Sequence, residues 1–343
     1  MSDRPLGVGI VGVGGIAPNH IAALRSTPLA ALRAVCDVDL SRATQLGRAE
    51  DCAAYGDLAE MLTDDDVEAV VVCTPNVSHA ALGQQVLDAG RHLLMEKPLA
   101  MNAQDARNLA ATAQQEGLAL AVGHSHRFSD QGRAIRETIE SGAIGTPRFV
   151  RIVINGGWIW PGWQSWILNP EVSGGHSLHN GVHLTDLATW WIGEHADSVF
   201  AVGQHATSAA LEIYDYLVVE LGFPSGASAI CEISRGERPR TSNFLEMTVV
   251  GSEGVLAREW DAQGLLAWGD TGLHTWAPHG EGARTFHREM ESFANAARGR
   301  APVIPSIDEA VHAVDVAVAA EQSLAEGRPI AIAEASIKQS GAV

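Results

Sequence analysis

The sequence predicts an α/β protein: a doubly wound parallel sheet followed by an α+β domain with a large, mostly antiparallel open sheet. Its 343 residues exceed what one ordinary core holds. Short apolar strands alternate with helices as far as about residue 124, as a doubly wound sheet requires. Longer strands with alternating polar and apolar residues follow, which suit an antiparallel sheet with one covered face. We therefore expect one domain over residues 1–124 and a second over residues 125–343.

The first element is an apolar strand over residues 6–11 that breaks into glycines and then opens into a helix over residues 18–26. Gly12 permits a tight turn, Gly14 lets the backbone approach a pyrophosphate, and Ala17 keeps the helix close to the strand. Free N–H groups at the helix start would attract phosphate charge. The spacing G-x-G-x-x-A predicts a dinucleotide-binding turn of the Rossmann type, made of Gly12, Gly14, Gly15, Ile16 and Ala17.

The second strand, over residues 31–38, carries Asp37 near its end. An acidic residue about 20 positions after the glycine turn binds the adenosine ribose hydroxyls in this fold. Its carboxylate would repel a 2′-phosphate, so we expect NAD rather than NADP. Arg42 lies close enough to keep NADP as a minority alternative, and an aspartate that merely caps a turn is the structural alternative for Asp37.

Two further strands end in polar turns. The strand over residues 67–73 stops at Thr74-Pro75-Asn76, before His79 and a helix to residue 90, and the strand over residues 92–95 stops at Glu96-Lys97-Pro98. Ligands bind beyond the carboxyl ends of such strands, so both turns should face the cofactor. A helix over residues 102–116 and a strand over residues 118–123 complete the first domain.

Lys97 is the most reactive residue of these turns. Pro98 keeps it out of the α region and holds it extended. A partly buried lysine beside the positive charge of an oxidised nicotinamide should have a lowered pKa and exchange a proton with a substrate hydroxyl. A solvated surface lysine is the alternative, and position alone does not decide between the two.

The second domain is predicted from its strands and two helices. A helix over about residues 175–192 follows a tryptophan-rich loop, and a last helix covers residues 307–326. The expected strands cover residues 148–154, 198–204, 216–223, 227–234 and 245–250.

Composition narrows the class of partner. The formal charge of −18, without a basic run, argues against nucleic acid and anionic membranes, so the partner is a small molecule. No signal peptide and no run of about 18 apolar residues appears. Four cysteines without disulfide or metal spacing indicate a reducing cytoplasm; they are Cys36, Cys52, Cys73 and Cys231.

The order of these motifs resembles the family of glucose–fructose oxidoreductase, inositol dehydrogenase and the rhizopine-catabolism oxidoreductases (Gfo/Idh/MocA). The first domain contributes the glycine turn with Asp37, T-P-N-x-x-H at residues 74–79 and A-G-R-H-L-L-M-E-K-P at residues 89–98. The second contributes S-G-A-I-G-T-P-R-F-V-R at residues 141–151 and G-G-x-x-x-x-x-G-x-H-x-x-D at residues 174–186. The resemblance covers nearly the whole chain.

The resemblance implies a Rossmann domain, hydride transfer between NAD(P) and a sugar or cyclitol carbon, and an open sheet that makes dimer or tetramer contacts. By position, Lys97 becomes the proton-transfer lysine and His183 the histidine that hydrogen-bonds the reacting hydroxyl. The cofactor shell it implies comprises Gly12, Gly14, Gly15, Ile16, Ala17, Asp37, Thr74, Pro75, Asn76, His79, Glu96 and Lys97.

Two departures from the family pattern bear on the substrate. Many members place an aspartate where this chain has His179, and an arginine and an aspartate in a W-R-x-D-P segment where this chain reads W-I-L-N-P at residues 166–170. A carboxylate and a guanidinium that would bind hydroxyls or an acid group are therefore missing. Their absence modestly favours a neutral substrate.

His176, His179 and His183 are spaced three and four apart and would share one face of a helix. Their imidazoles could ligate a metal together with Asp186. Because the resemblance supplies no metal here and imidazoles equally hydrogen-bond sugar hydroxyls, we expect no metal.

Aromatic and basic residues complete the predicted site. Four tryptophans between residues 158 and 166 are hard to explain as core alone, so one or two should stack on a sugar or wall off the pocket, with dimer contacts as the alternative. Arg127 contacts the substrate or only fixes the domain junction. Arg235, Arg238 and Arg240 form a basic cluster that we interpret as a solvated loop. The substrate-side candidates are Lys97, Arg127, Trp163, Trp166, His179, Asn180 and His183.

We therefore expect an NAD-dependent dehydrogenase of a neutral sugar or polyol, in which Lys97 takes the hydroxyl proton and His183 orients the hydroxyl or relays the proton. His179 is a further catalytic candidate. A glycosidase that keeps NAD bound and acts by transient oxidation is one alternative, and a non-catalytic cofactor-bound regulator is another.

Overall fold

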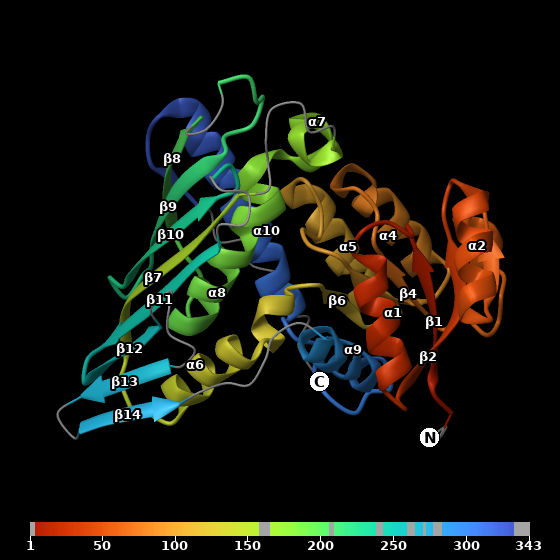
Figure 1. The fold of residues 1–343 in the computed structure, drawn as a ribbon, viewed down its shortest axis with the longest axis horizontal. Coiled ribbons are helices and arrows are strands. Elements are labelled where there is room, and N and C mark those ends of the chain that lie inside the picture. Colours follow the sequence, from red (N-terminus) through yellow and green to blue (C-terminus); the bar gives the residue numbers. More distant parts are fainter. Residues whose placement is uncertain are drawn as a thin grey trace.

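The computed structural model describes residues 4–157, 165–205, 209–237, 243–258, 265–269, 272–276 and 283–332. Two sheets stand side by side, each with helices packed on it (Figure 1). Among the described helices, none combines the length and the apolar character that a bilayer crossing requires. The predicted fold class is confirmed: a parallel doubly wound sheet precedes a mixed, mostly antiparallel one.

The first sheet is wholly parallel, with the strand order β3-β2-β1-β4-β5-β6. Its order reverses between β1 and β4, and ligands bind beyond the carboxyl ends of strands at such a point. The strands are β1 (Leu6–Val11), β2 (Ala30–Cys36), β3 (Ala53–Tyr55), β4 (Ala69–Val72), β5 (His92–Met95) and β6 (Leu120–Val122). The helices between them are α1 (Ala17–Ser26), α2 (Leu40–Glu50), α3 (Leu58–Leu62), α4 (His79–Asp88) and α5 (Ala103–Glu116).

The second sheet has nine strands in the order β14-β13-β12-β11-β7-β10-β9-β8-β15. Only the β10–β7 pair is parallel among the described pairings. The strands are β7 (Pro147–Gly156), β8 (Ser198–Gln204), β9 (Tyr216–Gly222), β10 (Ser228–Ser234), β11 (Asn243–Gly251), β12 (Gly254–Arg258), β13 (Leu265–Gly269), β14 (Gly272–Trp276) and β15 (Ile330–Ala331).

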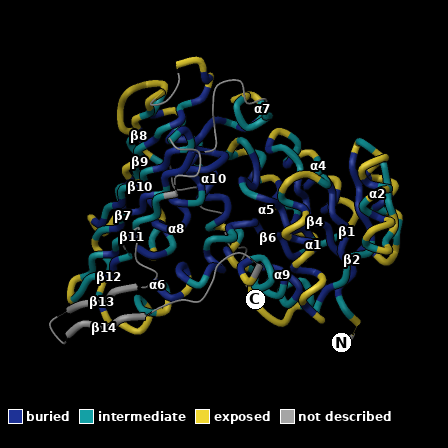
Figure 2. The backbone as a smooth tube through the Cα atoms, viewed as in Figure 1, coloured by how far each residue is buried: buried dark blue, intermediate teal, exposed yellow. Residues whose placement is uncertain are grey.

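Helices cover one face of this sheet: α6 (Asp130–Glu140), α8 (Val182–Ile192) and α10 (Ile307–Glu326) (Figure 1). Alternate strand residues pack beneath them, for example Val150 and Ile152 against Leu187. Most of the other residues of these strands are half-buried or exposed, as Figure 2 shows along β7 to β10. The sheet therefore has the one covered face that its alternating sequence predicts.

The chain after β14 returns to the first domain. The helix α9 (Ala283–Ala297), which the sequence pattern did not predict, packs against α1 and places Met290 and Phe293 in one core cluster with Ile21. The helix α10 contributes Val311 and Val314 to a second core cluster of the first domain, which also contains residues of α5. Residues 283–332 therefore contact both domains.

The predicted helix over residues 175–192 is helical along its length, but its first part contains a π-helical turn. A short helix α7 (Pro170–Ser173) ends at Gly174 and Gly175, whose φ angles are +77° and +91°. A π-helical turn, η4 (Ser177–Gly181), follows and leads into α8. The two left-handed glycines separate α7 from this helix, and the wider π turn follows them.

A buried ion cluster joins the two domains at η2 (Ser125–Phe128), directly after β6. Arg127 Nε and Nη2 donate to the two carboxylate oxygens of Asp186 in α8 at 2.8 and 2.7 Å. Arg127 Nη1 donates to Glu309 Oε1 in α10 at 2.7 Å, and the guanidinium lies over the ring of Trp190. Burial raises the pKa of Asp186, but the charge and hydrogen bonds of Arg127, together with the nearby histidines, hold that pKa below its usual value.

Replacing Arg127 should destabilise the protein strongly. Arg127→Met leaves Asp186 buried without its counter-charge, which costs roughly 3–5 kcal/mol of unfolding free energy. Arg133→Met removes only the exposed partner of Glu137 and should cost less than about 1 kcal/mol. Urea unfolding of both variants compares them, and equal losses would contradict the central role of Arg127.

Candidate active site

The glycine turn leaves an open cradle at the carboxyl end of β1. Gly12 has φ +85°, and a Cβ there would lie 2.8 Å from Thr74 Cγ2 and 2.9 Å from the Cys73 backbone. A Cβ on Gly14 or Gly15 would meet nothing within 4 Å. The start of α1 carries no side-chain cap. The turn fits a pyrophosphate, as its spacing predicts.

Asp37 lies beside this cradle and is already bonded to its backbone. Its Oδ2 accepts the Val13 N–H at 3.0 Å, and its Oδ1 accepts the Asp39 N–H at 2.9 Å. Arg42 Nη2 lies 3.5 Å from Asp37 Oδ1, and Arg42 Nε donates to Asp39 Oδ2 at 3.0 Å. The Asp37 carboxylate therefore positions the glycine turn as well as offering acceptors to a ribose. Arg42 lies directly beside that carboxylate.

The turn after β4 reaches the second domain. Asn76 Nδ2 donates to the Ser173 carbonyl at 2.7 Å and lies 3.5 Å from His179 Nδ1. His79 is fully buried, with its ring nitrogens 2.9 Å from the Thr74 carbonyl and 2.7 Å from the Pro98 carbonyl. His79 thus joins the turn after β4 to the turn after β5. It can act on a cofactor only by positioning these two turns.

Glu96 and Lys97 follow β5, and the two domains meet at their side chains. Lys97 Nζ donates to the His179 carbonyl in η4 at 2.6 Å. Burial lowers the pKa of Lys97 to about 8 against the opposing charge of Glu96, and the charge of Arg235 adds to the lowering. The amine therefore loses its proton near pH 8, within the range that general acid–base catalysis uses.

The Glu96 carboxylate is buried beneath this lysine. One oxygen lies 2.7 Å from His20 Nε2 in α1, and the other accepts the Lys97 backbone N–H at 3.2 Å. Glu289 of α9, buried and without a hydrogen-bond partner for its carboxyl group, has its pKa raised by burial and by the charge of Glu96. The negative charge of Glu96 thus lies near the Lys97 amine without a hydrogen bond to it.

Imidazoles surround the Lys97 amine. Burial lowers the pKa values of His179 and His183, and the charge of Lys97 lowers them further. The ring of His126, a residue that the sequence analysis did not single out, contacts that of His183 edge-on at 4.7 Å, and burial lowers its pKa to about 4. Asn180 Nδ2 and His183 Nδ1 are buried without hydrogen-bond partners. Neutral rings and an unpartnered amide suit neutral hydroxyl groups.

Two predicted substrate residues have different positions. Trp166 contacts the ring of His179 edge-on at 4.9 Å, which places it beside the histidines. Trp163 lies outside the described residues, as do Trp158 and Trp160. Arg127 is buried at the junction with three of its nitrogens engaged, so its contacts match the junction alternative rather than a substrate contact.

Arg235 corrects the interpretation of a solvated basic loop. It follows β10, and its charge lowers the pKa values of His126, His176 and Lys97, so it lies among them. Burial lowers the pKa of Arg235 itself to about 10. Its neighbours in sequence gave no sign of this, because β10 and η4 come together only in the fold. Arg238 and Arg240 lie outside the described residues.

The described histidines do not gather around a metal. His176 Nδ1 lies 2.8 Å from the Tyr214 carbonyl, while the π turn separates it from His183, which contacts His126. In the part of the chain that the structure describes, no group of three His, Cys, Asp or Glu side chains is placed to hold a metal ion.

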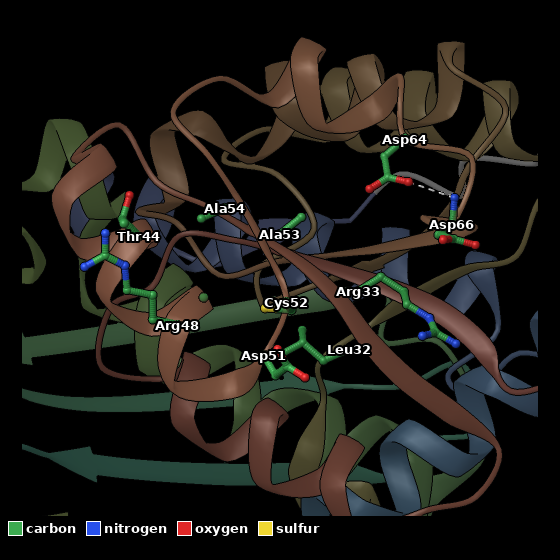
Figure 3. A pocket seen from close by; sticks show the side chains of 11 residues that line it. Leu32, Arg33, Thr44, Arg48, Asp51, Cys52, Ala53, Ala54, Asp64 and Asp66 are labelled. Carbon is green, nitrogen blue, oxygen red and sulfur yellow. Dashed lines mark hydrogen bonds between the residues drawn. The ribbon is translucent and has the colours of Figure 1, made fainter.

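A pocket of about 510 Å³ on the outside of the first domain contains none of these groups (Figure 3). It lies between α2, β2 and β3, with Arg33, Arg48 and Asp66 at its walls. Its one thiol, Cys52, has its pKa raised by burial and by the charges of Glu50 and Asp51. A protonated thiol is a poor nucleophile, which argues against Cys52 as a nucleophile.

The comparisons with known proteins agree with this geometry. Residues 6–124 match the model of an oxidoreductase family with an NAD-binding Rossmann fold, and residues 132–257 match the Gfo/Idh/MocA C-terminal domain. An inositol 2-dehydrogenase of Rhizobium meliloti is 30% identical over 95% of this chain and 98% of its own length. A myo-inositol 2-dehydrogenase of Thermotoga maritima is 28% identical over 95% and 98%. The crystal structure of GenD2 from gentamicin A biosynthesis, in complex with NAD, superimposes with a TM-score of 0.85 at 29% identity, over 96% of this chain and 97% of that one.

Substitutions at Gly12 and Gly14 of the turn should separate effects on NAD binding from effects on folding. Gly14→Val points into open space, so the melting temperature should stay unchanged while the affinity for NAD falls at least about tenfold. Gly12→Ala meets the Cys73 backbone and adopts a strained φ, so it should lower the melting temperature as well. Thermal unfolding and calorimetric titration with NAD measure both, and unaltered NAD binding by Gly14→Val would contradict the assignment.

Proposed function

Because the chain belongs to the Gfo/Idh/MocA family of NAD-binding oxidoreductases, we propose that it transfers a hydride between a CH–OH carbon of a neutral sugar or cyclitol and NAD. One observation carries the proposal. The Lys97 amine, with a pKa of about 8, lies at the carboxyl edge of the parallel sheet against the imidazole-rich turn η4. A base of this kind removes a hydroxyl proton at neutral pH.

Each residue of the site then has a role. The glycine turn and Asp37 hold NAD, which supplies the hydride acceptor when it is bound. Lys97 takes the hydroxyl proton, and His183 orients that hydroxyl or relays its proton. His179, Asn180 and Trp166 surround the remaining hydroxyls and one face of the ring. Thr74, Pro75 and Glu96 shape the cofactor edge, and His79 holds its two turns together.

The uncovered face of the second sheet supports a homodimer or homotetramer. Its half-buried or exposed apolar residues include Phe200, Val202 and Val218, and Val202 is 51% exposed. Such a face is commonly covered by a second copy of the chain. The cysteines, unpaired in the structure, support a reducing compartment, for which we propose the cytoplasm.

The rate of oxidation should follow the ionisation of Lys97. The kcat/KM for oxidation rises with pH through about 8 and then levels, because only the neutral amine accepts the hydroxyl proton. In the reducing direction it falls above the same pH, because the ammonium form donates. Lys97→Met should lose roughly 10²- to 10⁴-fold in kcat while still binding NAD. The substrate is first identified by following the absorbance of the reduced cofactor. The compounds screened in this panel are monosaccharides, anhydrosugars, inositols, sugar acids and aryl glycosides.

The same panel separates the alternatives. Aglycone release without net reduction would replace the dehydrogenase by a glycosidase that regenerates its cofactor. Silence across the panel, with NAD still bound, would favour a non-catalytic regulator. A sugar acid as the best substrate would overturn the neutral class and implicate Arg235.

Cofactor preference should change at Asp37. Asp37→Ser removes the charge that repels a 2′-phosphate and releases Arg42 from one of its two carboxylates. The ratio of kcat/KM for NADP to that for NAD should rise at least about tenfold. The added change Arg42→Ala should remove that gain. An unaltered ratio in Asp37→Ser would contradict the role of Asp37 in cofactor choice.

A further inference from the structure

A half-buried carboxylate from α10 meets the turn that receives Lys97. Glu321 of α10 accepts the Ser177 backbone N–H at 2.8 Å through its Oε1. Ser177 is the first residue of η4, and the His179 carbonyl two residues later accepts the Lys97 amine. Glu321 and Lys97 therefore bond to the same turn, one at its first amide and the other at a carbonyl inside it.

The backbone makes room for this carboxylate. A Cβ on Gly175 would lie 2.6 Å from Glu321 Oε1, so only glycine lets the carboxylate approach the turn. A partly desolvated charge with one hydrogen bond costs stability, so its place against the turn needs a reason other than stability. The start of a helical segment favours a negative charge, which adds to the bond with Ser177.

Few charged groups face Glu321. Burial raises its pKa to about 7, and the Ser177 amide opposes the rise. On the turn itself, burial lowers the pKa of His176 to about 3 and that of His179 further still. Lys97 approaches from the end of β5, and Asp315 of α10 pairs with Arg107 of α5. The pKa of Glu321 therefore lies between those of the histidines of the turn and that of Lys97.

We propose that Glu321 is a positioning residue for the reaction of Lys97: its carboxylate fixes the π turn η4 so that the His179 carbonyl holds the Lys97 amine toward the substrate. The carboxylate is ionised above pH 7 and bonds the turn strongly. Below that pH it is protonated and bonds weakly. The inference rests on the proposed function, in which Lys97 is the base.

Kinetics of two variants test it. Glu321→Leu removes the acceptor and should lower kcat at least tenfold with less than a twofold change in KM. Glu321→Gln keeps only a neutral acceptor, as the protonated carboxyl group does, so its kcat should lie between those of the wild type and Glu321→Leu. In the wild type the acid side of the kcat/KM profile should steepen below pH 7, where Glu321 and Lys97 are both protonated. In Glu321→Gln this second step should vanish. A wild-type kcat in Glu321→Leu, or a persisting step in Glu321→Gln, would overturn the proposal.

Two measurements without turnover keep the proposal testable if no substrate is found. Trp166 contacts His179, so the fluorescence difference between the wild type and Trp166→Phe should change near pH 7, and Glu321→Gln should abolish the change. The folded-state pKa lies above the unfolded value, so ionised Glu321 destabilises the fold increasingly between about pH 4.5 and 7. Glu321→Gln should therefore raise the melting temperature more at pH 8 than at pH 5. An absent fluorescence transition together with an equal effect at both pH values would refute the role of Glu321, whereas inactivity on every sugar would count only against the proposed function.

Discussion

The hydrogen bond from the Lys97 amine to the His179 carbonyl is the contact on which the site depends. It joins the carboxyl edge of the first sheet to the second domain. A carbonyl inside a regular α-helix already bonds the amide four residues on, so it is a poor acceptor for a side chain. The π turn at residues 177–181 changes that spacing, and the His179 carbonyl inside it accepts the Lys97 amine. The unusual helix thus contains the carbonyl that positions the lysine.

Three elements hold that turn in place. Asn76 reaches it from the first domain, Glu321 bonds its first amide from α10, and Trp166 covers the ring of His179. The ion cluster of Arg127 and Asp186 fixes the helix α8 that continues the turn. Because these contacts come from distant parts of the chain, the fold itself positions the reacting groups, as efficient general base catalysis requires.

The sequence predicted those helices and strands whose own residues mark both their apolar run and their ends. The strands β5 and β8 and the helix α10 have the predicted bounds, because apolar runs end there at turn residues or at a capping box. The π turn was predicted as α-helix, since the sequence of η4 differs little from that of an ordinary helix. The helix α9 and the positions of Glu289, Glu321 and Arg235 depend on contacts that span the chain, and no local pattern encodes such contacts.

The Lys97 amine lies near a carboxylate, that of Glu96, but its hydrogen bond goes to a different group, the His179 carbonyl. A carboxylate bonded to the amine would keep it protonated and remove it as a base. Here Glu96 bonds the Lys97 backbone N–H and His20, while the amine itself bonds a neutral carbonyl. The negative charge stays near enough to oppose the lowering of the pKa by burial and by Arg235, yet does not compete with the substrate for the proton. Geometry of the backbone, rather than the choice of residues alone, therefore sets the proton affinity of the base.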